Sequence, residues 1–222
     1  MTYVLQVTAM AFLALFYDNA VQTGEWTIGP SQDAGKVHFS LQGSRNGNDH
    51  FSHSSDWNSS DFEGMNWSTM TRHDVSFSIR RDAGVFQCDG FVKNGEGAGL
   101  FTFTPNADYS RRIEDLGYAD FDPDKQMSFA LFNVSYAFAK EMKAFNIADL
   151  NAQKLISFRI FKVDAAFVNS VRSAGLGTPS AEKLVAMRIH GVTPDYIHMM
   201  QSRGLHDLTV DQLIKLRIHG ID

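Results

Sequence analysis

Cysteine and basic charge are both scarce in this sequence of 222 residues. The single cysteine, Cys88, excludes an intrachain disulfide framework and any metal site built from several cysteines. Lys and Arg number 20 against 25 Asp and Glu, for a formal net charge of −5. Because nucleic-acid-binding domains usually carry a basic excess, this balance argues against nucleic acid as a partner. Cys88 lies in an alternating apolar segment and is predicted to be a buried, unreactive thiol.

Motifs of nucleophilic, metallopeptidase or nucleotide chemistry are also missing. The sequence has no Gly-x-Ser-x-Gly elbow, no His-Glu-x-x-His, no phosphate-binding glycine loop and no dinucleotide fingerprint. The glycine-rich stretch at residues 95–99 joins two predicted strands and leads into no helix, which favours a turn. We therefore predict no catalytic residue and no cofactor, and interpret the chain as non-enzymatic.

A run long enough to span a membrane is absent too. Residues 1–17 are uncharged and mostly apolar, but a membrane helix needs about 20 apolar residues. Their length suits the apolar core of a signal peptide, although no Lys or Arg precedes them. We predict a targeting or anchoring segment over residues 1–20, and assign any membrane contact to residues 1–17. A buried first strand or helix is the alternative.

Residues 24–104 show the alternation of a half-buried sheet. Apolar residues recur at every second position, as in Val37, Phe39 and Leu41, and Asn94-Gly95 is a hairpin turn. The pattern predicts five strands in a small antiparallel sheet with one packed and one solvated face. Residues 44–60 are rich in Ser, Asn, Asp and His and are predicted to be a long polar loop between the second and third strands.

That predicted loop carries the best metal candidates. His50 and His53 are three residues apart, with Asp56 close by, and such side chains can ligate zinc or a related ion. No third histidine stands at a defining spacing, so we predict no metal site and keep His50, His53 and Asp56 as weak candidates. A metal-binding or enzymatic role for residues 50–56 is kept as the alternative function.

From residue 105 onward the sequence repeats. Phe129, Phe158, Met187 and Leu216 are each 29 residues apart (158−129, 187−158, 216−187). The same step links Arg159-Ile160, Arg188-Ile189 and Arg217-Ile218. A fixed period of 20 to 50 residues marks a repeat architecture, so residues 105–222 are predicted to hold about three and a half copies of a short helix pair, stacked as in an α-solenoid. The predicted fold class is α+β.

The clearest copy shows how each helix pair is delimited. Ser180 and Thr193-Pro194 are helix starts, and Gly191 and Gly204 are helix ends. Thr209 with Gln212 predicts a capping box at the start of the last helix.

Polar residues that recur in the repeats are the candidate contacts to a partner. A histidine before a helix-ending glycine can interact with the last carbonyls and the helix dipole, which is a structural role. The recurring arginines can brace a neighbouring repeat through a carboxylate such as Asp195 or Asp211. Interpreted instead as exposed repeat positions, the partner-binding residues are Arg188, His190, Tyr196, Arg217 and His219.

Three phrases carry a resemblance to a known module: residues 81–84 (Arg-Asp-Ala-Gly), residues 95–103, and residues 187–194, which read Met-Arg-Ile-His-Gly-Val-Thr-Pro. Over residues 24–222 the chain resembles a bacterial module in which a small β-domain precedes helical repeats containing Arg-Ile-His-Gly-Val-Thr-Pro. That module occurs in exported proteins and in the extracytoplasmic tails of membrane proteins of the antirepressor type. The resemblance implies a binding or sensing role in the bacterial cell envelope. The peptidase zinc motif of those membrane proteins is missing here, so no protease activity is implied.

The sequence thus predicts a non-enzymatic interaction or sensing module that binds a protein or peptide partner through its helical repeats. The predicted location is the bacterial periplasm or extracytoplasmic face, with the cytoplasm as the alternative. A second alternative function is nucleic-acid binding, because short helix pairs can resemble helix-turn-helix units.

Overall fold

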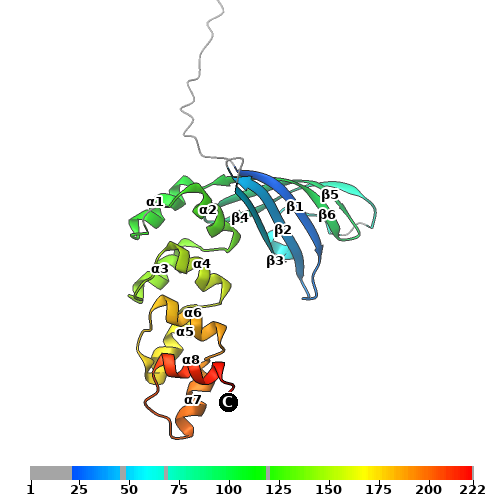
Figure 1. Ribbon diagram of the computed structural model, residues 1–222. Helices are drawn as coiled ribbons and strands as arrows, with labels where there is room; N and C mark the ends of the chain where they lie inside the picture. Colours follow the sequence, from blue (N-terminus) through cyan, green and yellow to red (C-terminus); the bar gives the residue numbers. More distant parts are fainter. Residues whose placement is uncertain (1–21, 46–48, 68–69, 119–120, 222) are drawn as a thin grey trace, which may run out of the picture.

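The computed structural model describes residues 22–45, 49–67, 70–118 and 121–221. The targeting segment predicted for residues 1–20 lies outside the described residues. Six strands form one antiparallel sheet in the order β3-β2-β1-β6-β5-β4 (Figure 1). The strands are β1 (Gln22–Pro30), β2 (Lys36–Arg45), β3 (Asp49–Asn58), β4 (His73–Arg81), β5 (Gly84–Lys93) and β6 (Glu96–Pro105).

Strand β3 corrects the sequence prediction of a polar loop and of five strands. It pairs with β2 along its length, from Asn58 opposite Lys36 to the hairpin end. Only Phe51 and Trp57 among its inward positions are strongly apolar, with His53 and Ser55 between them. The apolar alternation that identifies a half-buried strand is therefore absent, and pairing with β2 makes the strand instead.

Residues 59–63 follow β3 and connect it to the opposite edge of the sheet. A short 3-10 turn at Ser59–Asp61 leads to a single bridge between Glu63 and Ser78 of β4. This connection brings the two outer strands of the curved sheet toward each other.

Aromatic side chains fill the inner face of the sheet. The rings of Trp26 and Phe77 pack edge to face with their centres 5.1 Å apart. The rings of Phe39 and Phe62 pack in the same way, with the same distance between their centres. Gly90 and Gly99 face each other across β5 and β6, where a Cβ atom would come within 2.7 Å of the Trp26 side chain. Cys88 is buried as predicted, and burial raises the pKa of its thiol.

Eight helices follow within the described residues, so the predicted α+β fold is confirmed. Their starts fall into two series with 29-residue steps: 107, 136, 165 and 194, and 123, 152, 181 and 210. The helices are α1 (Ala107–Asp115), α2 (Pro123–Leu131), α3 (Tyr136–Ala144), α4 (Ala152–Ile160), α5 (Ala165–Val171), α6 (Ala181–Ile189), α7 (Pro194–Ser202) and α8 (Val210–Ile218). A π-helical segment, Arg172–Leu176, extends α5.

Local chemistry explains why the chain stops and starts at these points. Every one of the eight helices has a side-chain N-cap, and the predicted caps Ser180, Thr193 and Thr209 are confirmed, the last as a capping box. Each helix is followed by a residue with positive φ, between 49° and 88°. These residues are Gly117, Asn133, Asn146, Lys162, Gly175, Gly191, Gly204 and Gly220.

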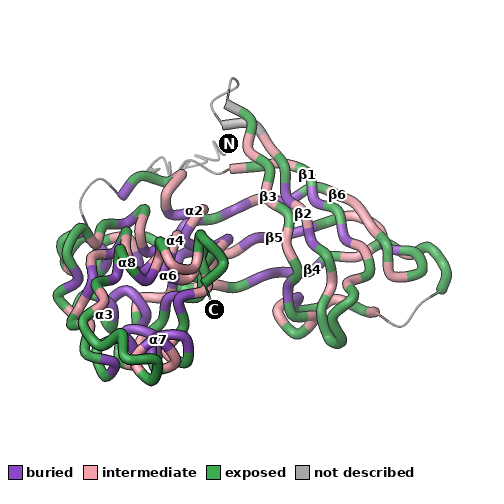
Figure 2. Tube along the Cα trace, turned by 60° about the horizontal axis from the view of Figure 1, so that its bottom comes forward, coloured by how far each residue is buried: buried purple, intermediate pink, exposed green. Residues whose placement is uncertain are grey.

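The helices stack in a column that we call the helical array, with the sheet projecting sideways from its α2 end (Figure 1). Helix α2 packs against β5 and β6, and α2, α4, α6 and α8 follow one another down the column. Buried segments run through both the strands and the helices (Figure 2). In the part of the chain that is described, no helix has the length and apolarity needed to cross a bilayer.

Candidate functional site

The recurring arginines connect successive layers of the helical array. Arg188 donates from Nε and Nη2 to the carbonyl of Lys162, just after the end of α4, and its guanidinium lies 4.2 Å from the centre of the Phe167 ring. Arg159 and Arg217 repeat this arrangement at the preceding helix ends, donating to the carbonyls of residues 132 and 190. A cation there also meets the negative end of the helix dipole. The arginines brace the array through backbone carbonyls and aromatic rings, whereas the sequence suggested that carboxylates would hold them.

Several of the predicted partner-binding residues make these contacts within the helical array. The side chains of Arg188 and Arg217 already make hydrogen bonds and cation–π contacts within the helical array. Tyr196 is only 4% exposed, lies under Arg217, and donates its hydroxyl to the carbonyl of Ile221 at 2.8 Å, so its prediction as an exposed position is wrong. His190 and His219 are exposed and stand at the C-cap positions of α6 and α8.

Isoleucines next to these arginines form an exposed apolar row. Ile160, Ile189 and Ile218 are 48%, 54% and 57% exposed, although each ends a helix whose other apolar residues are largely buried. They occupy equivalent positions at the C-terminal ends of α4, α6 and α8, and these helix ends lie on the side of the column beneath the projecting sheet (Figure 1). We call these three residues the isoleucine row.

The sheet covers the corresponding position of the first layer. Leu131, 29 residues before Ile160, is buried, and the ring of the next residue, Phe132, meets His53 of β3 edge to face at 4.9 Å. Strand β3 therefore packs at the layer of α2, where the isoleucine row would begin, and leaves the following layers open.

A cleft of about 620 Å³ lies where β3 meets the helix ends. One wall contains four consecutive residues of β3, from Ser55 to Asn58. Alternate side chains of a strand point to opposite faces, so four residues in a row can line one cavity only along the edge of the strand. The opposite wall comes from the helical array and contains Leu131, Phe132, Asn133, Phe158, Arg159, Lys162, Val163, Asp164 and Arg188.

Basic residues outnumber acidic ones in this cleft. Five cations line it, namely Lys36, Arg81, Arg159, Lys162 and Arg188, against three carboxylates, namely Asp56, Asp61 and Asp164. The Arg159 guanidinium has a lowered pKa, first because the cleft partly buries it and second because the charge of Arg81 is near. The local balance of +2 (5−3) contrasts with the net −5 of the chain.

The weak metal candidates do not converge. His50 and Asp56 lie on the outer face of β3, whereas His53 points to the inner face against Phe132. His53 bonds to Ser55 at 3.0 Å, and burial lowers its pKa. Across the described ranges, no group of three or more His, Cys, Asp or Glu side chains could hold a metal ion.

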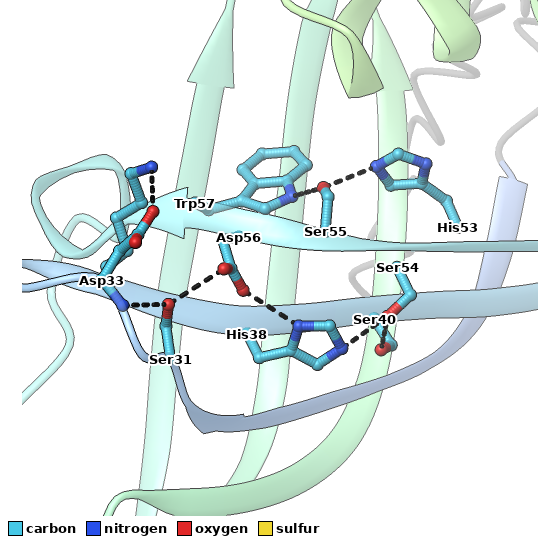
Figure 3. Close-up of polar contacts among 10 residues, drawn as sticks. Ser31, Asp33, His38, Ser40, His53, Ser54, Ser55, Asp56 and Trp57 are labelled. Atoms are coloured by element: carbon cyan, nitrogen blue, oxygen red, sulfur yellow. Dashed lines mark hydrogen bonds and ion pairs between the residues drawn. The ribbon is translucent and has the colours of Figure 1, made fainter. Parts of the chain in front are cut away.

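The outer face of β2 and β3 instead holds a chain of polar contacts, drawn in Figure 3. Asp56 Oδ1 is 3.0 Å from Nδ1 of His38, whose Nε2 is 2.7 Å from Oγ of Ser54, and Ser40 bonds to Ser54 at 2.8 Å. The contact to His38 is the main cause that lowers the pKa of the Asp56 carboxyl, with a second bond from Ser31. The order Asp–His–Ser is that of a hydrolase triad.

Sequence motifs predicted neither the Asp56–His38–Ser54 contacts nor the exposure of the isoleucine row. The triad-like chain joins cross-strand partners, His38 opposite Asp56 and Ser40 opposite Ser54, and so depends on the β2–β3 register. The only hint in the sequence was that polar residues alternate along the segments that form β2 and β3. The isoleucine row was visible as a 29-residue recurrence, but its exposure was not.

Comparisons with protein-family models, curated proteins and solved structures returned no match to this chain.

Proposed function

We propose that this protein is a non-enzymatic binding module that takes up an extended segment of a partner protein by strand addition to β3. The observation that carries the proposal is the cleft lined by four consecutive residues of that edge strand. An edge strand presents backbone groups that a partner strand can pair with, and neighbouring pockets then select its side chains.

The isoleucine row supports the same proposal from the helical array. Strand β3 already packs on the first layer through the contact of His53 with Phe132. A segment added beside β3 would continue this interface over the next layers, where Ile160 and Ile189 are exposed. Burying apolar surface contributes about 25 cal/mol per Å², so such residues can anchor a partner.

We place the module in the bacterial cell envelope, because of its resemblance to the exported module with Arg-Ile-His-Gly-Val-Thr-Pro repeats. The full chain fused to alkaline phosphatase, an enzyme that folds only after export, should give activity in intact bacteria. Activity that appears only after lysis would favour the cytoplasm.

The binding proposal is tested by selecting random twelve-residue peptides on the intact protein. We expect enriched peptides to lose about tenfold or more in affinity for Ile189→Asp, since a charge would replace an apolar contact. Leu100→Asp is the matched control, because Leu100 is an equally exposed apolar residue on the outer face of β6.

Hydrogen exchange locates the bound peptide. Strand addition should protect those amides of residues 55–58 that point away from β2, and should leave the amides of the other edge strand, β4, unchanged. Failure to enrich peptides, peptides that bind Ile189→Asp as well as the parent, or protection on β4 alone would each overturn the proposal.

The Asp56–His38–Ser54 chain supports a second function, that of a hydrolase with Ser54 as nucleophile. In such a reaction His38 Nε2 would take the Ser54 hydroxyl proton, and Asp56 would hold the imidazole through Nδ1. We rank this function second, because β2 is an interior strand whose amides pair with β1 and β3 and do not supply an oxyanion hole.

A fluorophosphonate probe separates the two functions. An activated Ser54 would attack phosphorus, release fluoride and pass its proton to His38, leaving a covalent phosphonyl adduct. Labelling that disappears in Ser54→Ala and persists in Ser52→Ala, the next residue on the same face, would establish the hydrolase. An absence of labelling is the result expected for the binding module.

A further inference from the structure

Arg81 is the most enclosed cation of the cleft. It ends β4 and its side chain is only 12% exposed, with the guanidinium 5.1 Å from the Trp57 ring centre. Nη2 donates to Asp61 at 2.7 Å, and Nη1 donates to the carbonyl of Arg80 at 3.3 Å. These contacts fix the plane of the guanidinium at the wall of the cleft.

One nitrogen of Arg81 makes no hydrogen bond to the described residues. Its Nε is buried and has no acceptor among the described residues. A buried N–H of a charged group without an acceptor costs more than 1 kcal/mol on a typical scale, so such groups are normally satisfied by protein, water or a ligand. Within the described residues, the Arg81 guanidinium therefore carries a positive charge that the chain satisfies only in part.

Arg159 extends this donor set on the opposite wall. It uses Nε to hold the carbonyl of Phe132, and its charge and that of Arg81 act on each other across the cleft. An anion between the two guanidinium groups would turn this repulsion into two attractions.

The acidic residues of the cleft are already engaged. Asp61 binds Arg81, Asp56 binds His38 and Ser31, and Asp164 caps α5 by accepting the amide of Phe167. They reduce the positive field without filling the space between the arginines. The remaining excess of two positive charges in the cleft attracts an anionic group, and one carboxylate on a bound segment would supply a negative charge between the arginines.

We infer that the cleft contains an anion site, formed by Arg81 and Arg159, that takes a single carboxylate of the bound segment. This inference deepens the proposed function, since it specifies an acidic ligand for the same cleft. A planar carboxylate between the two walls can accept from the guanidinium groups of Arg81 and Arg159 at once, since both residues line the cleft. The carboxylate comes from an Asp or Glu side chain or from a chain terminus.

The test uses small probes, so it does not depend on strand addition. The ¹⁵N–¹H signals of the arginine Nε groups are followed in the intact protein while N-acetyl-Ala-Asp-Ala-amide is added. We expect the Arg81 and Arg159 signals to shift saturably, with at least about tenfold weaker binding of N-acetyl-Ala-Asn-Ala-amide, which lacks only the charge. N-acetyl-Ala-Ala-Ala with a free carboxylate distinguishes a chain terminus from a side chain as the source.

Two variants localise the effect. Arg159→Gln should abolish saturation, whereas Arg111→Gln, on the exposed surface of α1, should leave it intact. If Arg159→Gln fails to fold, the test rests on the parent protein, in which the affinities of the Asp-containing and Asn-containing peptides are compared. Linear shifts, equal binding of both probes, or tighter binding of inorganic phosphate would overturn the inference. Saturable binding of the probes without any selected peptide would retain the anion site and reject strand addition.

Discussion

At the scale of single residues, the recurring arginine performs three tasks with one side chain. In Arg188 the guanidinium completes the carbonyl at one helix end, covers the Phe167 ring and lies at the negative end of the α4 dipole. Its recurrence every 29 residues is thus explained by stability. In the proposed function, ligand recognition is assigned to residues beside it, such as Ile189.

Replacing Arg188 should therefore weaken folding. We expect Arg188→Ala to lower the free energy of unfolding by about 1–3 kcal/mol, the range for a charge-assisted hydrogen bond together with a cation–π contact. Arg188→Lys should recover less than half of the loss, because an ammonium lacks the planar fork that donates from two nitrogens. Urea unfolding measures both values, and a Lys variant as stable as the parent would contradict this account.

His53 should make stability depend on pH. Burial lowers the pKa of His53 below its usual value near 6.5, so just below pH 6.5 the unfolded chain binds a proton that the folded chain does not. The contribution of His53 to stability is complete above pH 6.5 and is lost as the pH falls toward the folded pKa. In His53→Phe, which keeps a ring against Phe132, the loss of unfolding free energy between pH 7.5 and pH 5.5 should be smaller than in the parent.

Exposed His198 on α7 provides the control for this measurement. His198→Gln should retain the parent's dependence on pH. An unchanged dependence in His53→Phe would mean that other groups are responsible.

At the scale of elements, one helix end carries a residue poorly suited to it. Four equivalent positions after α2, α4, α6 and α8 have positive φ, and three of them are Asn or Gly, which tolerate it. The fourth is Lys162, with φ of 56°.

Lys162→Gly should raise the free energy of unfolding by about 0.5–1 kcal/mol, because glycine accepts the left-handed conformation without a Cβ penalty. The carbonyl that Arg188 binds remains in place. Lys162→Ala is the matched control and should give no gain, since it removes the side chain but keeps the Cβ. Thermal and urea unfolding measure both, and an equal gain in the two variants would attribute the effect to the lost charge instead.

The elements differ in how far the sequence predicted them. Helix ends were predictable because caps such as Thr193 and left-handed residues such as Gly191 act within a few residues of chain. The hairpin at Asn94-Gly95 was predictable for the same reason. Strand β3 was not, because its pairing with β2 rather than its own apolar pattern makes it a strand.

The candidate site was less accessible still. The cleft joins Trp57, Arg81 and Arg159, which lie on β3, β4 and α4. Their meeting depends on the curvature of the sheet and on its placement over the helical array. Neither follows from local spacing, so the sequence pointed to Arg188 and Tyr196, whose recurrence reflects packing within the array.

At the scale of the whole molecule, a junction of polar bonds fixes the sheet on the helical array. Gln126 of α2 is buried and donates to the carbonyls of Ala83 and Asn106, both at 2.7 Å. Asp82, in the same β4–β5 turn as Ala83, accepts the backbone amide of Tyr136 at the start of α3. The proposed site needs this junction, since the cleft has one wall on each side of it.

Gln126→Leu should uncouple the two parts of the molecule. All three tryptophans, Trp26, Trp57 and Trp67, lie in the sheet half, so their fluorescence reports on the sheet while helical circular dichroism reports on the array. In the parent the two urea transitions should coincide, because both halves share one continuous core. In Gln126→Leu the loss of two buried hydrogen bonds, about 1–3 kcal/mol, falls on the junction, and the transitions should separate. Ser128→Ala is the control, because it removes a hydrogen bond within α2 only, and its two transitions should still coincide. Coincident transitions in Gln126→Leu would contradict the prediction and would show that apolar packing of α2 on β5 and β6 suffices to hold the cleft.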